Sequence, residues 1–127
     1  MQVAFSAYPS SSLTLSANSK VVFGKTRTNI GNAYSTNTGI FTVPVDGVYA
    51  FHWTIMVNKG RYSEIFIQVN GSNKAVMFAH ANGYSNYYSP SQSYVTELKK
   101  GDQVSLYNRG STGYAYSTYS TFTGYRL

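Results

Sequence analysis

Apolar and polar residues alternate along most of this chain with a period of two, which is the repeat of a β-strand with one buried face. Val, Ile, Thr, Tyr and Phe gather in short segments between Gly, Asn, Ser and Pro, and no segment repeats at helical spacing. We therefore predict an all-β chain of about nine or ten short strands, typical of a sandwich or jelly roll. The expected strands are Val3 to Tyr8, Lys20 to Phe23, Ile40 to Pro44, Gly47 to Asn58, Glu64 to Asn70, Ala75 to His80, Ser93 to Leu98, Gln103 to Asn108 and Tyr119 to Leu127.

Several of the expected turns have a clear chemical signature. Asn70-Gly71 tolerates the positive φ of a two-residue hairpin, so the strand that ends at Asn70 should pair with the one that starts near Lys74. Gly101-Asp102 offers similar freedom. Pro44 is expected at a strand end or bulge, where no ladder N–H is needed.

The expected strand from Gly47 is unusual because both of its faces begin with apolar residues. One face carries Tyr49, Phe51, Trp53, Ile55 and Val57. The other carries Val48, Ala50, His52, Thr54 and Met56. If the first face fills a sandwich core, the second needs another cover, and a second copy of the chain is the simplest one. We therefore expect an oligomer whose interface also includes Phe122, Tyr125 and Leu127 near the C-terminus.

Two polar stretches, 82–93 and 108–120, are rich in Tyr, Asn, Ser and Gly. Antibody loops use the same residues, because Tyr offers a rigid amphipathic face while Ser, Asn and Gly adapt their hydrogen bonds. These stretches are candidate binding loops. In the alternative interpretation, Tyr87, Tyr88, Tyr114 and Tyr116 cover sheet edges or pack between subunits.

The composition of the 127 residues narrows the function classes. The length indicates one domain over residues 1–127, and no apolar run reaches the roughly 18 residues that a membrane span needs. The net charge of +6 is dispersed, which favours anionic glycans or membrane surfaces over nucleic acid as partners, although a merely solvated basic surface explains it as well. The sequon Asn70-Gly71-Ser72 gives weak support for secretion.

No motif of an enzyme or a metal site is present. The chain has no cysteine, four carboxylates and two histidines, and neither His52 nor His80 has an evident triad partner. We expect no catalytic residue, no required cofactor and no zinc site. His52 is better explained as a hydrogen-bonded residue of the packed layer than as a metal ligand.

One series of residues carries a specific resemblance. Phe23, Asn29, Tyr34, Phe41, Gly47, Tyr49 and Phe51 follow one another at the spacing of the signature of the complement C1q globular-domain family. Trp53 stands where that family usually has Phe or Tyr, and the ending Phe122 to Leu127, "FTGYRL", continues the likeness. The resemblance covers essentially the whole chain.

This resemblance implies a ten-stranded jelly roll that assembles as a trimer, related in architecture to tumour necrosis factor ligands. Family members are mostly secreted, often after a collagen-like stalk. This chain contains no Gly-x-y run, so it is similar to the family members of bivalve molluscs that lack such a stalk. Several members hold calcium near the trimer axis; Glu64, Glu97 and Asp102 are candidate ligands here, but the few carboxylates do not support such a site.

The implied function is innate-immune recognition of microbial glycans such as mannose polymers, lipopolysaccharide or sialylated and other anionic sugars. Loop position and side-chain chemistry select the candidate contacts Arg61, His80, Asn82, Tyr84, Asn86, Tyr87, Arg109, Tyr114 and Tyr116. Two alternatives stay open: a cytokine-like trimer that binds a cell-surface receptor, and the trimerising head of a matrix or spore-surface protein.

Overall fold

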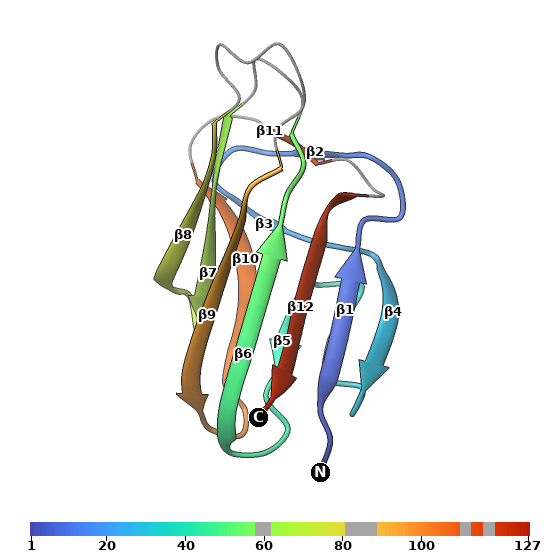
Figure 1. Cartoon of the computed structure of the whole chain (residues 1–127), viewed down its shortest axis with the longest axis vertical. Helices are drawn as coiled ribbons and strands as arrows, with labels where there is room; N and C mark the ends of the chain where they lie inside the picture. The colour runs from blue at the N-terminus through green and yellow to red at the C-terminus, as the bar shows by residue number, and fades with distance from the viewer. Residues whose placement is uncertain (58–61, 81–88, 110–112, 116–118) are drawn as a thin grey trace.

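A computed structural model describes residues 1–57, 62–80, 89–109, 113–115 and 119–127. Two antiparallel sheets pack face to face, and the strands run along the long axis of the molecule (Figure 1). In the described residues no helix is long and apolar enough to cross a membrane.

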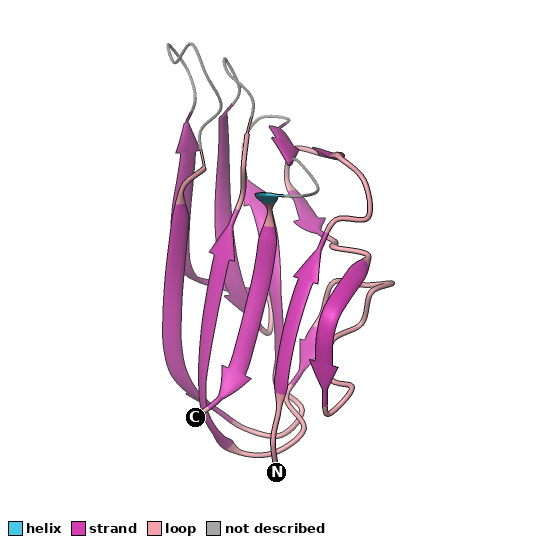
Figure 2. Cartoon of the chain, turned by 45° about the vertical axis from the view of Figure 1, so that its right-hand side comes forward, coloured by secondary structure: helices cyan, strands magenta, loops and turns pink. Residues whose placement is uncertain are grey.

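The first sheet has the strand order β4-β1-β12-β6-β9. Its strands are β1 (Ala4–Tyr8), β4 (Lys25–Ile30), β6 (Gly47–Thr54), β9 (Ser91–Leu98) and β12 (Thr121–Arg126). Both termini lie at the lower end of this sheet in Figure 2. The strand expected from Gly47 is β6, which lies between the C-terminal strand β12 and β9.

The second sheet has the order β3-β10-β7-β8, and β5 adds a short pairing to β10. Its strands are β3 (Ser19–Val21), β5 (Phe41–Thr42), β7 (Tyr62–Val69), β8 (Ser72–His80) and β10 (Gln103–Arg109). A separate pair joins β2 (Leu13–Leu15) to β11 (Gly113–Ala115). The all-β, two-sheet prediction is confirmed, with this small third pair in addition.

Large aromatic side chains from several strands meet between the two sheets. Tyr49, Phe51 and Trp53 of β6 are fully buried, as the period-two pattern predicts. Phe122 of β12, which was expected at the interface between copies, is 1% exposed and belongs to this core, because its side chain points between the sheets toward Phe5 and Phe51. Gly124 makes this packing possible, because a Cβ at that position would lie 2.6 Å from ring atoms of Phe5 and Phe51. A glycine is therefore required where β12 crosses the aromatic core.

Three observed strands were not expected from the sequence. Strand β4 reads Lys-Thr-Arg-Thr-Asn-Ile and is mostly exposed or half-buried, so it has no apolar alternation to detect. It is held instead by its ladder to β1 at the edge of the sheet. Strands β2 and β11 are three residues each, too short for a periodic signal.

Several expected strands are longer in the prediction than in the structure, and two of them show why. The strand predicted over Gly47 to Asn58 ends at Thr54, although Ile55 and Val57 beyond it are still fully buried. The strand predicted over Ile40 to Pro44 is reduced to Phe41–Thr42. In both cases the apolar run continues past the end of the ladder, because burial does not require pairing.

The expected hairpin turn is confirmed. Asn70 and Gly71 have φ angles of 52° and 83°, the left-handed conformation of a two-residue hairpin, and they join β7 to β8. Gly101 has a φ of 94° in the turn between β9 and β10, where Cβ-bearing residues are strained.

Candidate functional site

The strands that flank the Tyr-rich stretches end together at one end of the sandwich. Thr54 at the end of β6 pairs with Ser91 at the start of β9 and with Thr121 at the start of β12. Arg109 at the end of β10 pairs with Glu64 near the start of β7. This is the upper end in Figure 1, and it is called the loop end below.

The predicted glycan contacts are only partly covered by the description. The backbones of His80 and Tyr114 lie in β8 and β11, paired with Tyr62 and Thr14. Arg109 is the predicted contact whose side chain is described. The remaining six lie outside the described residues: Arg61, Asn82, Tyr84, Asn86, Tyr87 and Tyr116.

Arg109 is exposed at the end of β10 and lies near an aromatic ring. Its guanidinium carbon is 5.7 Å from the centre of the Phe66 ring, within the range of a cation–π contact. The N–H groups of the planar guanidinium can donate a forked pair of hydrogen bonds to a carboxylate or phosphate group. Arg109 therefore combines positive charge with a fixed direction at the loop end.

The outer face of the first sheet carries a continuous apolar row. Direct pairing connects one residue from every strand of this sheet in the order Ile30, Ala4, Tyr125, Ala50 and Val95. Ile30 and Val95 at its two ends are 48% and 56% exposed, whereas Ala50 is nearly buried by its neighbours. Val48 and Leu127, 37% and 68% exposed, lie next to this row toward the lower end.

Toward the loop end this face becomes polar, so the apolar surface expected for a contact between copies is confined to the row and the residues below it. The next row toward the loop end consists of Thr28, Ser6, Thr123, His52 and Ser93. His52 is exposed in the single chain and lies 3.3 Å from the hydroxyl oxygen of Tyr125, with the two rings stacked at 5.8 Å. Met56, half-buried beyond the end of β6, donates its backbone N–H to the Ser120 hydroxyl.

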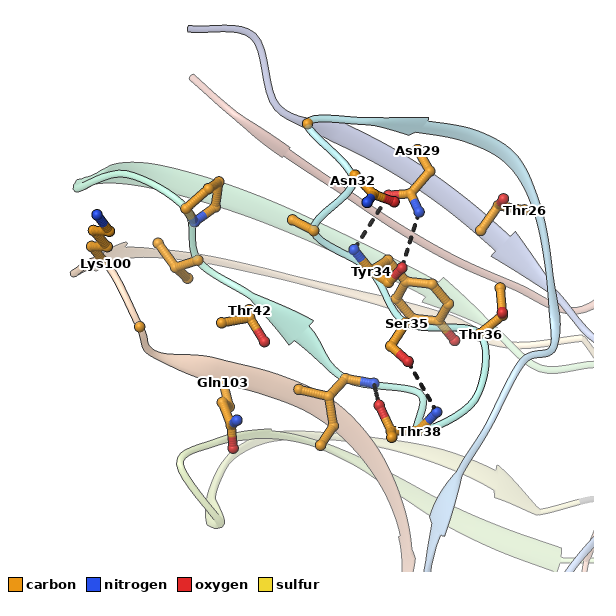
Figure 3. Close-up of a pocket in the computed structure, with 16 residues that line it drawn as sticks. Thr26, Asn29, Asn32, Tyr34, Ser35, Thr36, Thr38, Thr42, Lys100 and Gln103 are labelled. Atoms are coloured by element: carbon orange, nitrogen blue, oxygen red, sulfur yellow. Dashed lines mark hydrogen bonds between the residues drawn. The ribbon is translucent and has the colours of Figure 1, made fainter.

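A polar groove lies at the opposite end from the loop end. Strand β4, the connection 31–40, strand β5 and the start of β10 line a cavity of about 930 Å³ (Figure 3). This volume is near the top of the range of about 300–1,000 Å³ that is usual for small-ligand sites. Most lining side chains are hydroxyls or amides, with Lys100 as the charged member.

Hydrogen bonds fix the wall of this groove. The Asn29 amide donates to the backbone carbonyl of Tyr34 at 2.9 Å, and its oxygen accepts the Tyr34 N–H at 3.2 Å, as the dashed lines in Figure 3 show. The Tyr34 hydroxyl donates to the Phe23 carbonyl at 2.8 Å. Burial raises the pKa of the Tyr34 hydroxyl from its ordinary 10.0 to about 12, partly offset by this hydrogen bond.

Two carboxylates near the groove accept hydrogen bonds from backbone N–H groups. Asp46 accepts the Lys100 N–H at 2.8 Å, and Asp102 accepts the Lys99 N–H at 2.9 Å and the Asn70 amide at 3.1 Å. The hydrogen bonds from Lys99 and Asn70 hold the pKa of the Asp102 carboxyl below its ordinary value. Among the residues described, no group of three or more His, Cys, Asp or Glu could hold a metal ion.

The groove was not predicted from the sequence. Its connection reads Gly-Asn-Ala-Tyr-Ser-Thr-Asn-Thr-Gly over residues 31–39, a polar stretch like the two that were chosen as candidate binding loops. The available signal was this run of Ser, Thr and Asn. Its partners on β10 are about 60 residues away in the chain, and only the tertiary structure brings them together.

Comparisons with known proteins give a consistent result. The family model described as "C1q domain" matches residues 4–127. The heavy metal-binding protein HIP of Mytilus edulis is 33% identical over 108 residues, which cover 83% of this chain and 50% of that protein. Complement C1q tumor necrosis factor-related protein 3 of Mus musculus is 32% identical over 131 residues, which cover 100% of this chain and 52% of that protein. The chain thus spans about half the length of these curated relatives.

Solved structures agree on the fold. The globular domain of zebrafish complement 1qA superposes with a TM-score of 0.82 at 20% identity, covering 98% of this chain and 97% of that chain. Murine APRIL at pH 5.0 gives a TM-score of 0.77 at 15% identity, with both chains covered completely. The resemblance drawn from the spacing of aromatic residues and the jelly-roll prediction are both confirmed.

Proposed function

Because this chain belongs to the C1q domain family, we propose that it is a secreted recognition module of innate immunity that binds microbial surface glycans at its loop end. The observation that carries this proposal is the common end at which the strands around the Tyr-, Asn- and Arg-rich stretches finish. The candidate ligands are mannose polymers, lipopolysaccharide and sialylated or other anionic sugars.

The chemistry of the loop-end residues suits a sugar. Tyr rings cover the apolar face of a pyranose, and Asn and Ser amides and hydroxyls replace water around its hydroxyl groups. Arg109, directed by its contact with Phe66, supplies a fork for a carboxylate or phosphate substituent. The net charge of +6 attracts anionic glycans over the distance of a Debye length, about 8 Å at physiological ionic strength.

We further propose that three copies assemble through the outer face of the first sheet. The exposed apolar row from Ile30 to Val95 supports this, since contact with a second copy removes its side chains from water. A shallow single-sugar site has a dissociation constant of about 1 mM, and three linked sites raise avidity by about two to four orders of magnitude. Assembly thus converts weak contacts into useful recognition.

The main alternative is a receptor ligand. The relatives named complement C1q tumor necrosis factor-related protein 3, in Mus musculus and Homo sapiens, favour it by their names. Heavy-metal binding, the property in the name of the Mytilus relative, finds no support in the described residues, where no cluster of metal-binding side chains occurs.

A glycan array probed with the purified protein at several salt concentrations tests the proposal. Arg109→Gln and Tyr84→Ala should each weaken binding to the best glycan by about tenfold, the cost of a charge-assisted hydrogen bond or a stacking contact. Lys74→Gln removes the same charge near the start of β8, toward the opposite end of the sandwich, and should leave the binding unchanged.

Three results would contradict the proposal. No glycan bound on the array, with capture of a cell-surface receptor instead, would support the cytokine-like alternative. Equal losses in Arg109→Gln and Lys74→Gln, with binding to every polyanion, would indicate unspecific charge attraction. Unchanged binding in both loop-end variants would place the sugar elsewhere on the molecule.

A further inference from the structure

We propose that the polar groove between β4, β5 and the start of β10 is a second binding site, and that its ligand is an acidic oligosaccharide. The groove and the loop end lie at opposite ends of β10, about 20 Å apart by the rise of a strand. This site therefore shares no residue with the glycan contacts proposed above, and it stands or falls independently of them.

The lining of the groove fits a saccharide better than an apolar ligand. Thr36, Thr42 and Asn32 present hydroxyl and amide groups, and Ala33, Ile40 and Pro44 present small apolar surfaces between them. A pyranose ring has the same composition, with hydroxyls around its edge and C–H groups on its faces. No exposed large hydrophobic side chain lines this groove within the described residues, so a lipid tail or an amphipathic helix has little to bury there.

Three polar side chains of the lining are free to bind a ligand. Within the part of the chain that is described, the side chains of Asn32, Thr36 and Thr42 take part in no hydrogen bond. Their positions are nonetheless fixed by the backbone. Thr42 donates its N–H to the Ala33 carbonyl at 2.9 Å, and Gly39 donates to the Ser35 carbonyl at 2.8 Å. A ligand would therefore meet a wall that is already ordered, which lowers the entropic cost of binding.

Lys100 selects an acidic sugar. Asp102 in the turn and Asp46 before β6 accept backbone N–H groups of this turn, and the Lys100 ammonium makes no ion pair within the described residues. The backbone of this turn is held by the same bonds, so the amine extends from a fixed base. A carboxylate, sulfate or phosphate on the sugar would meet this charge at the mouth of the groove, while Thr42 and Gln103 meet the ring hydroxyls.

Two matched probes test the site by heteronuclear NMR: a short oligogalacturonate, which carries carboxylates, and the corresponding neutral oligogalactose. We expect saturable shifts at the amides of Thr36, Thr42, Lys100 and Gln103, with tighter binding of the acidic probe. The shifts should not extend to Arg109 at the loop end. Shifts confined to the loop end, or none at either end, would overturn the proposal.

Substitutions separate charge from hydrogen bonding. Lys100→Gln should weaken the acidic probe by about two- to fivefold, the size of one exposed ion pair, and leave the neutral probe unchanged. Thr42→Val keeps the size of the side chain and suits a strand, and it should weaken both probes by about fivefold. The same spectra report whether each variant is folded.

Lys99→Gln is the matched control, because Lys99 is the exposed neighbour of Lys100 and does not line the groove. Equal weakening in Lys99→Gln and Lys100→Gln would indicate general charge attraction and overturn the site. Shifts at the groove that depend on protein concentration and not on the probe would assign the groove to a second copy of this chain. If the glycan array shows no binding at the loop end while the groove shifts persist, only the loop-end proposal fails.

Discussion

At the scale of single residues, Tyr34, Phe41 and Phe51 of the family signature surround the ring of Phe5. The Phe5 ring stacks on Tyr34 at 4.9 Å and on Phe41 at 5.0 Å, and it meets Phe122 edge-on at 4.9 Å. The Asn29 side chain hydrogen-bonds with both the N–H and the carbonyl of the Tyr34 backbone. The spacing that identified the family thus selects the residues that build the aromatic core and one wall of the groove.

Tyr34→Phe tests the polar part of this arrangement. Removing the Tyr34 hydroxyl leaves the buried Phe23 carbonyl without its hydrogen-bond donor. We therefore expect the free energy of unfolding to fall by about 1–2 kcal/mol in denaturant titrations. Tyr125→Phe is the control, because within the described residues the Tyr125 hydroxyl hydrogen-bonds with the exposed side chain of His52. This variant should lower the free energy of unfolding by less than about 0.5 kcal/mol in the same assay. Equal costs would show that the Tyr34 hydrogen bond contributes little.

The same residue gives an alkaline signature. Because the pKa of Tyr34 in the folded chain is about 12, above its ordinary 10.0, its contribution to stability is complete below pH 10 and is lost as the pH rises toward 12. We expect Tyr34→Phe to reduce the alkaline loss of stability in unfolding curves measured across this range. If Tyr34→Phe loses as much stability as the parent protein between pH 10 and 12, other groups cause that loss.

At the scale of elements, two turns from different hairpins are joined by one network. Asn70 in the β7–β8 turn donates to Asp102 in the β9–β10 turn and accepts the Gln103 N–H at 2.9 Å. The Asn70 N–H also donates to the Gln103 carbonyl at 2.8 Å. The side chain of Asn70 therefore both favours the left-handed turn and ties that turn to β10.

Asp102→Asn should make stability less sensitive to acid. The pKa of the Asp102 carboxyl is lowered in the folded chain, so its contribution is present above the ordinary carboxyl pKa of about 4 and is lost as the pH falls below it. We expect the variant to be less stable at neutral pH and to differ less from the parent in acid, by thermal unfolding at both values.

Gln68→Ala is the control for this prediction. It removes a 2.8 Å hydrogen bond to Asn73 on the same hairpin without removing a titrating group. Its effect should be the same at both pH values. A pH-independent loss in Asp102→Asn, like that of the control, would refute the role of the Asp102 carboxylate.

At the scale of the whole molecule, the two sheets differ in what they offer to the outside. The first sheet exposes the apolar row that ends at Ile30 and Val95, beside a polar row that includes His52. The loop end and the groove lie at the two ends of the sandwich. Assembly through the first sheet would leave the ends of the sandwich free to bind ligands.

Val95→Lys tests the proposed assembly. A charge within an apolar contact is costly to bury, so the variant should be a monomer at dilute concentration by light scattering, whereas we expect the parent protein to be a trimer. Phe78→Lys changes a side chain of similar exposure, 53%, on the second sheet and should remain a trimer. A parent protein that is already monomeric would refute the threefold assembly.

The alternation of apolar residues by itself determined the strands of the core, because a buried face must repeat every second residue. It also determined the Asn70-Gly71 hairpin, since few residue pairs tolerate two positive φ angles. Strand β4 was not predicted from the sequence, because an edge strand that is exposed or half-buried on both faces has no such repeat. The position of Arg109 at the loop end was predictable from its place after a strand.

Only the tertiary structure decided which distant residues meet. The groove joins Thr36 to Lys100 and Gln103, and the apolar row joins Ile30 to Val95 through three intervening strands. Neither set shares a local pattern, because strand order and register depend on the packing of the whole core and not on any one segment. Chemistry that lies within one segment is therefore readable from the sequence, while a surface built across strands is not.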